Sequence, residues 1–150
     1  MLNLYRLLIN LVLLISPLII ILRLIKKKEH PIRFKEKFCF FPIKRGNGKL
    51  VWFHGSSVGE ILSIIPLVEK LEKNKSIKKI LITSSTLSSS KVLTKFKLKK
   101  TVHQFFPIDA NFLTKKFLDY WNPAIAIFVE SEIWPNMLIN VKKNQYLLYF

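Results

Sequence analysis

Apolar residues fill the beginning of the chain and then recur in short runs separated by helical patterns. Residues 7–22 are sixteen uncharged residues in a row, with Arg6 and Arg23 at the two ends. From residue 50 onward, short apolar runs alternate with stretches whose apolar positions repeat at helical spacing. Such alternation predicts right-handed βαβ units, so we expect an α/β domain with a Rossmann-like parallel sheet.

The same pattern places the individual elements. Strands are expected at 50–54, 79–83, 102–106 and 124–129, and the ending 146–150 resembles the start of another. Helices are expected at 60–73, at 88–98, up to about residue 120, and from about Pro135, since proline is favoured in the first turn of a helix. Asp109 or Asn111 is expected to cap the helix that ends near residue 120.

The apolar run at 7–22 predicts a membrane anchor. A helix needs about 20 residues to cross a bilayer core, so this run makes either a short span or a deeply embedded anchor. The positive charge lies mainly after the run, at 26–28, and no small-x-small cleavage site follows, which favours an uncleaved anchor over a signal peptide. A buried core helix is the third alternative. The positive-inside rule places the chain from residue 26 onward in the cytoplasm.

The charge is strongly positive and unevenly spread. The chain has 25 Lys and Arg against 9 Asp and Glu, a net charge of +16, concentrated in 23–49 and 70–100. Such an excess indicates a nucleic acid, a membrane surface or a phosphorylated substrate, unless lysine is simply the common surface residue. We therefore expect three parts: a membrane anchor at 1–25, a basic interfacial connector at 26–49, and the α/β domain at 50–150.

The most informative motif is the turn after the first strand of the domain. Small residues occupy 55–59, and Glu60 is the first acidic residue of the following helix. The turn lies at the carboxyl end of a strand, where open α/β sheets bind ligands, and Glu60 lies at a helix N-terminus. Glu60 is therefore a candidate general base, and Ser56, Ser57 and Gly59 are candidates for substrate binding.

The same turn formally matches the G-x-S-x-G elbow of serine hydrolases, with Ser57 as the nucleophile. That triad requires an acid and then a histidine later in the chain. The last histidine is His103, and the later acidic residues Asp109, Asp119, Glu130 and Glu132 all follow it. The elbow also normally follows several strands, so the hydrolase is the weaker alternative.

A second acidic cluster follows the strand at 124–129. Glu130 and Glu132 stand at its carboxyl end, close to Asn136. In a parallel sheet these residues share one edge with Glu60, so the carboxylates could shift each other's pKa and leave one able to accept a proton. Glu130 is thus a second catalytic candidate, while Glu132 and Asn136 are candidates for substrate binding. Solvated cap residues are the alternative interpretation.

Other polar residues carry weaker signals. Thr83 and Ser84, at a strand end, could donate hydrogen bonds to phosphate or sugar oxygens, or could simply begin a capped helix. His54 is more typical of a packed residue than of a catalyst. The three histidines and the single Cys39 lack metal-ligand spacing, and the sequence has no glycine-rich phosphate motif, so neither a metal nor a cofactor is expected. One cysteine also excludes an internal disulfide.

These motifs together resemble the bacterial 3-deoxy-D-manno-octulosonic acid (Kdo) transferases of lipopolysaccharide assembly. The resemblance runs through nearly all 150 positions and is carried by the anchor, RFKEKF at 33–38, HGSSVGE at 54–60, FPID at 106–109, Pro123 and ESEIWPN at 130–136. Each motif alone is weak, but their combined spacing is specific. The chain departs from the family pattern at Lys37, Cys39, Leu87 and Ser89.

The resemblance implies a GT-B glycosyltransferase built from two Rossmann-like domains. It implies that the amino-terminal domain binds the lipid A precursor, that the other domain binds CMP-Kdo, and that Kdo is transferred with inversion and without a metal. Glu60 matches the family's general base, and Glu130 matches a second functional acid. It further implies an inner-membrane location with the catalytic domain on the cytoplasmic face.

Three expectations follow from the length. We expect the donor domain to be absent, the acceptor domain at 50–150 to be incomplete, and the chain to be inactive in transfer by itself. The other function left open is a membrane-anchored basic module that binds anionic lipid. Nucleic acid is not the expected partner.

Overall fold

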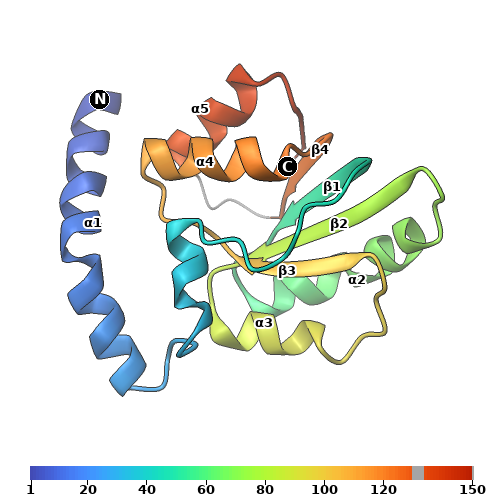
Figure 1. The fold of residues 1–150 in the computed structure, drawn as a ribbon, viewed down its shortest axis with the longest axis horizontal. Coiled ribbons are helices and arrows are strands. Elements are labelled where there is room, and N and C mark those ends of the chain that lie inside the picture. Colours follow the sequence, from blue (N-terminus) through green and yellow to red (C-terminus); the bar gives the residue numbers. More distant parts are fainter. Residues whose placement is uncertain (130–133, 150) are drawn as a thin grey trace.

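A five-stranded parallel sheet forms the centre of the part of the chain that the structure describes, residues 1–129 and 134–149 (Figure 1). The computed structural model orders its strands β3-β2-β1-β4-β5, and every neighbouring pair is parallel. The strands are β1 (Lys49–His54), β2 (Ile77–Ser84), β3 (Thr101–Phe105), β4 (Ile125–Phe128) and β5 (Leu147–Tyr149). The predicted α/β class is therefore confirmed.

Helices cover both faces of this sheet. Alternate residues of β1 point to opposite faces, as the pleat of a strand requires. Val51 and Phe53 belong to one apolar cluster with the first two connecting helices, whereas Leu50 and Trp52 belong to a second cluster with the other two. The connecting helices are α2 (Val58–Glu72), α3 (Leu87–Leu93), α4 (Asn111–Trp121) and α5 (Pro135–Lys143).

Two expected details differ from the structure. The helix predicted at 88–98 ends at Leu93, where the Thr94 hydroxyl donates to the Lys91 carbonyl at 2.8 Å. The N-cap of α4 is Ala110, which provides no side-chain cap. Asp109 instead accepts hydrogen bonds from the backbone N–H groups of Asn136 and Met137, at the start of α5. The expected cap therefore serves a different helix, because the loop after β3 runs beside the N-terminus of α5.

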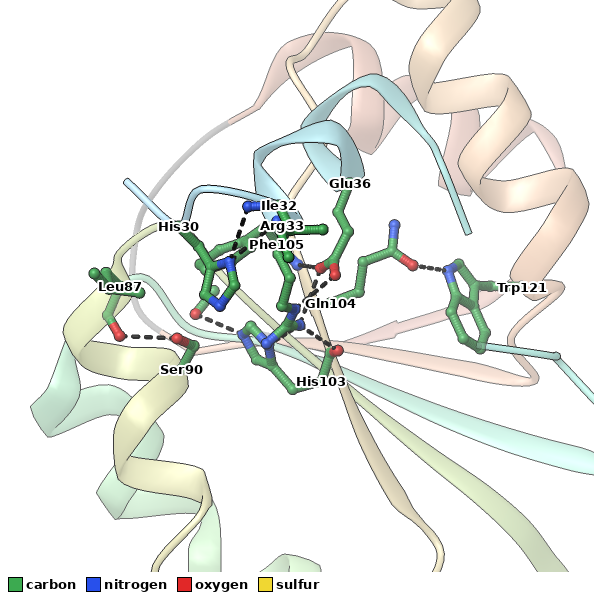
Figure 2. Close-up of polar contacts among 11 residues, drawn as sticks. His30, Ile32, Arg33, Glu36, Leu87, Ser90, His103, Gln104, Phe105 and Trp121 are labelled. Carbon is green, nitrogen blue, oxygen red and sulfur yellow. Dashed lines mark hydrogen bonds and ion pairs between the residues drawn. The ribbon is translucent and has the colours of Figure 1, made fainter. Parts of the chain in front are cut away.

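The segment before the sheet contains the short 3-10 helix η1 (Arg33–Phe38), which packs against β3. Glu36 is buried and holds Arg33 through two hydrogen bonds, at 2.6 and 3.0 Å, and it also accepts from the Phe105 backbone N–H (Figure 2). Arg33 reaches Nδ1 of His103 at 2.8 Å, and Nε2 of His103 contacts the Ser84 hydroxyl at 2.9 Å. These contacts fix η1 to the sheet.

Cys39 ends η1 in the left-handed conformation and is almost fully buried. Its thiol donates to the Leu113 carbonyl at 3.2 Å, and burial raises the pKa of the thiol to about 12. A neutral, enclosed thiol is unreactive.

The long helix α1 (Leu2–Ile25) precedes these elements and is apolar enough to cross a membrane by its length and composition. It lies alongside the domain, near η1 and the amino-terminal end of α4 (Figure 1). Pro17 lies inside the helix without ending it.

Candidate functional site

The candidate site lies at the edge of the sheet where the parallel strands end. Since β1, β2, β3 and β4 are mutually parallel, the segments that follow them meet at this edge. The turn at 55–57 follows β1, Ser85 follows β2, Phe106 follows β3, and Trp134 precedes α5. The edge predicted from the sequence is thus formed.

The Glu60 side chain is held by hydrogen bonds at the turn after β1, where the sequence predicted it. Ser57 is the N-cap of α2 and accepts from the Glu60 backbone N–H at 3.2 Å, while the Ser56 N–H donates to Oε2 of Glu60 at 2.7 Å. This reciprocal arrangement is close to a capping box and fixes the carboxylate at the positive end of a helix. In the described part of the chain, Oε1 of the half-buried Glu60 has no hydrogen bond. One carboxylate oxygen therefore positions the group, and the other has no hydrogen-bond partner among the described residues.

Gly55 allows this close packing. A Cβ atom at residue 55 would lie 3.2 Å from the Glu60 Cβ and 3.3 Å from the Ile61 Cδ1. The Gly55 backbone N–H also donates to the Thr83 carbonyl at 3.1 Å, which continues the pairing of β1 with β2. A side chain at residue 55 would therefore require Glu60 or Ile61, in the first turn of α2, to shift by a few tenths of an ångström.

His54 lies directly before this turn and is buried. Its Nδ1 contacts both the carbonyl and the hydroxyl oxygens of Thr83, at 3.2 and 3.0 Å, and its ring stacks on Phe106 with centroids 4.0 Å apart. Burial lowers its pKa to about 4, so the ring is neutral at pH 7. It is a packed residue, as expected.

Thr83 and Ser84 are both fully buried behind the edge. The Thr83 hydroxyl accepts from the Trp52 indole N–H at 2.9 Å, and the Ser84 hydroxyl contacts His103. Their hydroxyls thus bond within the protein, and substrate contact by them stays a prediction. Ser85, the next residue of the same tract, is half-buried, and its hydroxyl lies 3.4 Å from that of Ser56.

A groove of about 260 Å³ opens beside Ser85, between α1 and the sheet edge. Its walls are mainly apolar, with one lysine, one serine and one aspartate among them. The lining residues are Ile9, Val12, Lys37, Ser85, Phe106, Pro107, Ile108, Asp109 and Trp134. The contact between Ser85 and Ser56, and the bond from the Ser56 N–H to Glu60, connect this groove with the candidate base.

Reasoning from the sequence missed Ser85, Trp134 and the wall provided by α1. The Ser/Thr tract after β2 was the available signal for Ser85, but the pattern alone did not show which hydroxyl faces outward. The contribution of α1 had no signal in the sequence, because it depends on the packing of residues about a hundred positions apart.

The remaining predicted residues have different outcomes. Asn136 is buried, with its amide group donating to the Asp109 carbonyl at 2.6 Å and its amide oxygen accepting from Arg6 at 2.9 Å, so both ends are engaged within the chain. Gly59 lies exposed in the first turn of α2. Glu130 and Glu132 lie outside the described residues.

The serine hydrolase alternative gains no support from the geometry. The Ser57 hydroxyl caps α2 and contacts no histidine in the described part of the chain. His54 and His103 instead direct Nδ1 or Nε2 to Thr83 and Ser84. No activating base is available to Ser57 among these residues.

The parallel sheet, helices on both faces and a carboxylate at the carboxyl edge define the chain as an α/β protein of the class that binds ligands at this edge. Comparison with known proteins then identifies the family. A sequence model described as 3-Deoxy-D-manno-octulosonic-acid transferase (kdotransferase) matches residues 32–150. The chain belongs to this family of glycosyltransferases.

Individual relatives agree with this assignment. A 3-deoxy-D-manno-octulosonic acid transferase of Rickettsia bellii is 39% identical over 148 residues, which cover 99% of this chain and 35% of the relative. A probable mitochondrial 3-deoxy-D-manno-octulosonic acid transferase of Arabidopsis thaliana is 35% identical over 128 residues, 83% of this chain and 29% of the relative. A transferase of the same name from Haemophilus influenzae is 27% identical over 137 residues, 86% of this chain and 31% of the relative. The chain spans about a third of the length of these relatives.

Proposed function

We propose that this chain is the acceptor-binding part of a GT-B glycosyltransferase that transfers Kdo from CMP-Kdo to a lipid A precursor. The main observation that supports this proposal is the position of Glu60. Its carboxylate is fixed by the Ser56 N–H at a helix start, at the open edge of the sheet. The family assignment supports the reaction class, and the apolar groove beside this edge suits a lipid acceptor.

In the proposed reaction, Glu60 accepts the proton of an acceptor sugar hydroxyl while that oxygen attacks the anomeric carbon of Kdo. The bond from Kdo to CMP breaks, CMP departs with the bonding electrons, and the configuration at the anomeric carbon inverts. Glu130 is proposed as the second acid near the reacting centre. The step uses no metal or organic cofactor. A general base positioned in this way contributes about 10²- to 10⁴-fold to the rate.

The other parts of the proposal concern location and extent. α1 holds the domain to the inner membrane on its cytoplasmic face. The lysines and arginines of residues 23–49 and 70–100 face anionic lipid and the phosphates of the acceptor rather than nucleic acid. CMP-Kdo is bound by a second domain outside these 150 residues. The 150 residues by themselves are therefore expected to bind lipid without transferring Kdo.

The test is Glu60→Gln in the complete transferase, assayed with CMP-Kdo and a lipid A precursor. Glutamine keeps an oxygen that can accept from the Ser56 N–H, so the fold of the turn should persist while the base is lost. We expect Kdo transfer to fall by about 10²-fold or more, with lipid binding retained.

The matched control is Glu69→Gln, which removes an exposed carboxylate from the same helix and should leave transfer unchanged. Full activity of Glu60→Gln would contradict the assignment of the base. If the complete protein bound anionic vesicles but transferred no Kdo under any condition, the alternative of a basic lipid-binding module would replace the proposal.

A further inference from the structure

One side of α1 contacts the domain at several residues of its amino-terminal half, from Tyr5 to Leu13. The helix has 24 residues and is thus about 36 Å long. Most of its partly or fully buried positions recur every three or four residues, which places them on a single stripe. The partly or fully buried residues are Leu2, Tyr5, Arg6, Ile9, Leu13, Ser16, Ile20, Arg23 and Leu24. Leu13 packs against the main apolar core, and Ser16 and Ile20 are buried.

The amino-terminal end of α1 is bonded to the domain by polar groups. The Tyr5 hydroxyl donates to Oδ2 of Asp109 at 2.7 Å, and the Arg6 guanidinium donates to Oδ1 of Asn136 at 2.9 Å. Asp109 and Asn136 are both buried and join the loop after β3 to the start of α5. We call the contacts of Tyr5 and Arg6 with these two residues the amino-terminal hook.

The carboxyl-terminal end of the helix is bonded to the connector. Arg23 pairs with the buried Glu29 at 3.1 Å, and Glu29 also pairs with Lys37 of η1 at 2.7 Å. The amino-terminal end of α1 therefore contacts the domain directly, and its other end contacts the connector, whose η1 packs against β3. A helix that crossed a bilayer would carry Tyr5 and Arg6 to the opposite face, where Asp109 and Asn136 could not follow.

The rest of the α1 surface is apolar and open. Twelve large apolar side chains of the helix are exposed: Leu4, Leu7, Leu8, Leu11, Val12, Leu14, Ile15, Leu18, Ile19, Ile21, Leu22 and Ile25. Three lysines follow at 26–28, where they can meet anionic headgroups. The uncharged run of sixteen residues, about 24 Å as a helix, is also shorter than a bilayer core of about 30 Å.

We propose that α1 is an in-plane helix that enters one leaflet of the membrane and does not span it. The amino-terminal hook keeps Met1 on the same side of the membrane as the domain, while the exposed apolar side chains contact the acyl chains of that leaflet. This places the groove between α1 and the sheet edge directly at the lipid surface. The inference concerns topology and does not depend on the identity of the transferred sugar.

The test compares two cysteine reporters in the complete protein, in a background without other accessible cysteines. One cysteine is placed in a short flexible extension ahead of Met1, and the other is Lys75→Cys, in the exposed loop before β2. Inside-out and right-side-out membrane vesicles are treated with a membrane-impermeant maleimide. Cys39 is 1% exposed and should not react.

We expect both reporters to be labelled in inside-out vesicles and neither in right-side-out vesicles. If the reporter ahead of Met1 were labelled only in right-side-out vesicles, while Lys75→Cys were labelled only in inside-out vesicles, the helix would span the membrane. That result would overturn the inference. Recovery of the protein in the soluble fraction would overturn it as well. A failure of either kind leaves the Glu60→Gln transfer assay unaffected, so the two proposals fail separately.

Discussion

At the scale of single residues, the buried ionisable groups have two separate uses. Glu60 is half-buried at an open edge, whereas Glu36 is buried and surrounded by donors from Arg33 and the Phe105 backbone. Figure 2 shows Glu36, Arg33 and His103 pointing toward one another between η1 and β3. The first carboxylate is the proposed base, and the second joins η1 to β3.

Replacing Glu36 by alanine should destabilise the protein strongly. The change leaves the Arg33 guanidinium and the Phe105 N–H without their acceptor, and loss of one partner of a buried ion pair costs about 3–5 kcal/mol; the low end applies here because Arg33 is partly exposed. Denaturant unfolding in detergent measures the change. Glu69→Ala, on an exposed face, should stay within about 0.5 kcal/mol of the parent. Equal stability of the two variants would show that the Glu36 cluster does not stabilise the fold.

Two histidines, the buried His54 and the partly buried His103, predict a loss of stability in acid. Burial lowers the pKa of His54 to about 4, and burial together with the Arg33 charge lowers that of His103 to about 3. The unfolded chain binds these protons near pH 6.5, so unfolding takes up protons between about pH 6.5 and 4. Stability should therefore fall as the pH drops through this window, by about 1–2 kcal/mol per histidine at pH 5.

Unfolding free energies measured at pH 7 and pH 5 test this expectation. The variant His103→Gln cannot titrate and keeps polar atoms that can face Ser84 and Arg33. It should show a smaller difference between the two pH values than the parent does. An unchanged difference would mean that His103 is not held neutral in the folded state.

At the scale of elements, one carboxylate joins three segments that are distant in sequence. Asp109 accepts from the first backbone N–H groups of α5 and from Tyr5 of α1, although burial raises the pKa of the Asp109 carboxyl. Trp134, at the N-cap of α5, provides no capping side chain of its own. The start of α5 therefore depends on a residue from the loop after β3.

Asp109→Ala should consequently weaken both α5 and the attachment of α1. Removing a side-chain acceptor at a helix start costs about 1–2 kcal/mol, and the lost bond from Tyr5 adds to this. Asp119→Ala, in an exposed position of α4, is the control. Hydrogen exchange should rise at Asn136 and Met137 in the first variant only. If their protection were unchanged, other groups would have to satisfy these two N–H groups.

At the scale of the whole molecule, α1, the groove and the Glu60 carboxylate lie next to one another in space, in that order, on one side of the domain. α1 forms a wall of the groove, Ser85 and Ser56 lie between the groove and the turn, and Glu60 stands at the turn. Under the two proposals, with α1 in one leaflet and Glu60 as the base, a lipid acceptor would reach Glu60 without leaving the membrane. The net charge of +16 would then attract the domain to anionic headgroups.

Much of this arrangement could be predicted because it depends on local patterns. The alternation of short apolar runs with helical spacing predicted the parallel sheet, and the small residues before Glu60 predicted a turn at its ligand-binding edge. α3 was predicted too long, since no glycine or proline marks its end and the bond from Thr94 to Lys91 is visible only in the structure. The cap formed by Asp109 was assigned to the wrong helix, because its bonds to the start of α5 are also visible only in the structure.

The sequence by itself determined the α/β class, the apolar helix at the start of the chain and the position of Glu60 at a helix start, because each follows from neighbouring residues or from a fixed period. Only the tertiary structure decided that Glu36 is buried, that Ser85 rather than Thr83 or Ser84 faces the groove, and that α1 lies against the domain. These features depend on contacts such as the one between Tyr5 and Asp109, 104 positions apart. No local pattern encodes such a contact, since it forms only when the packing of the sheet and helices brings the two residues together.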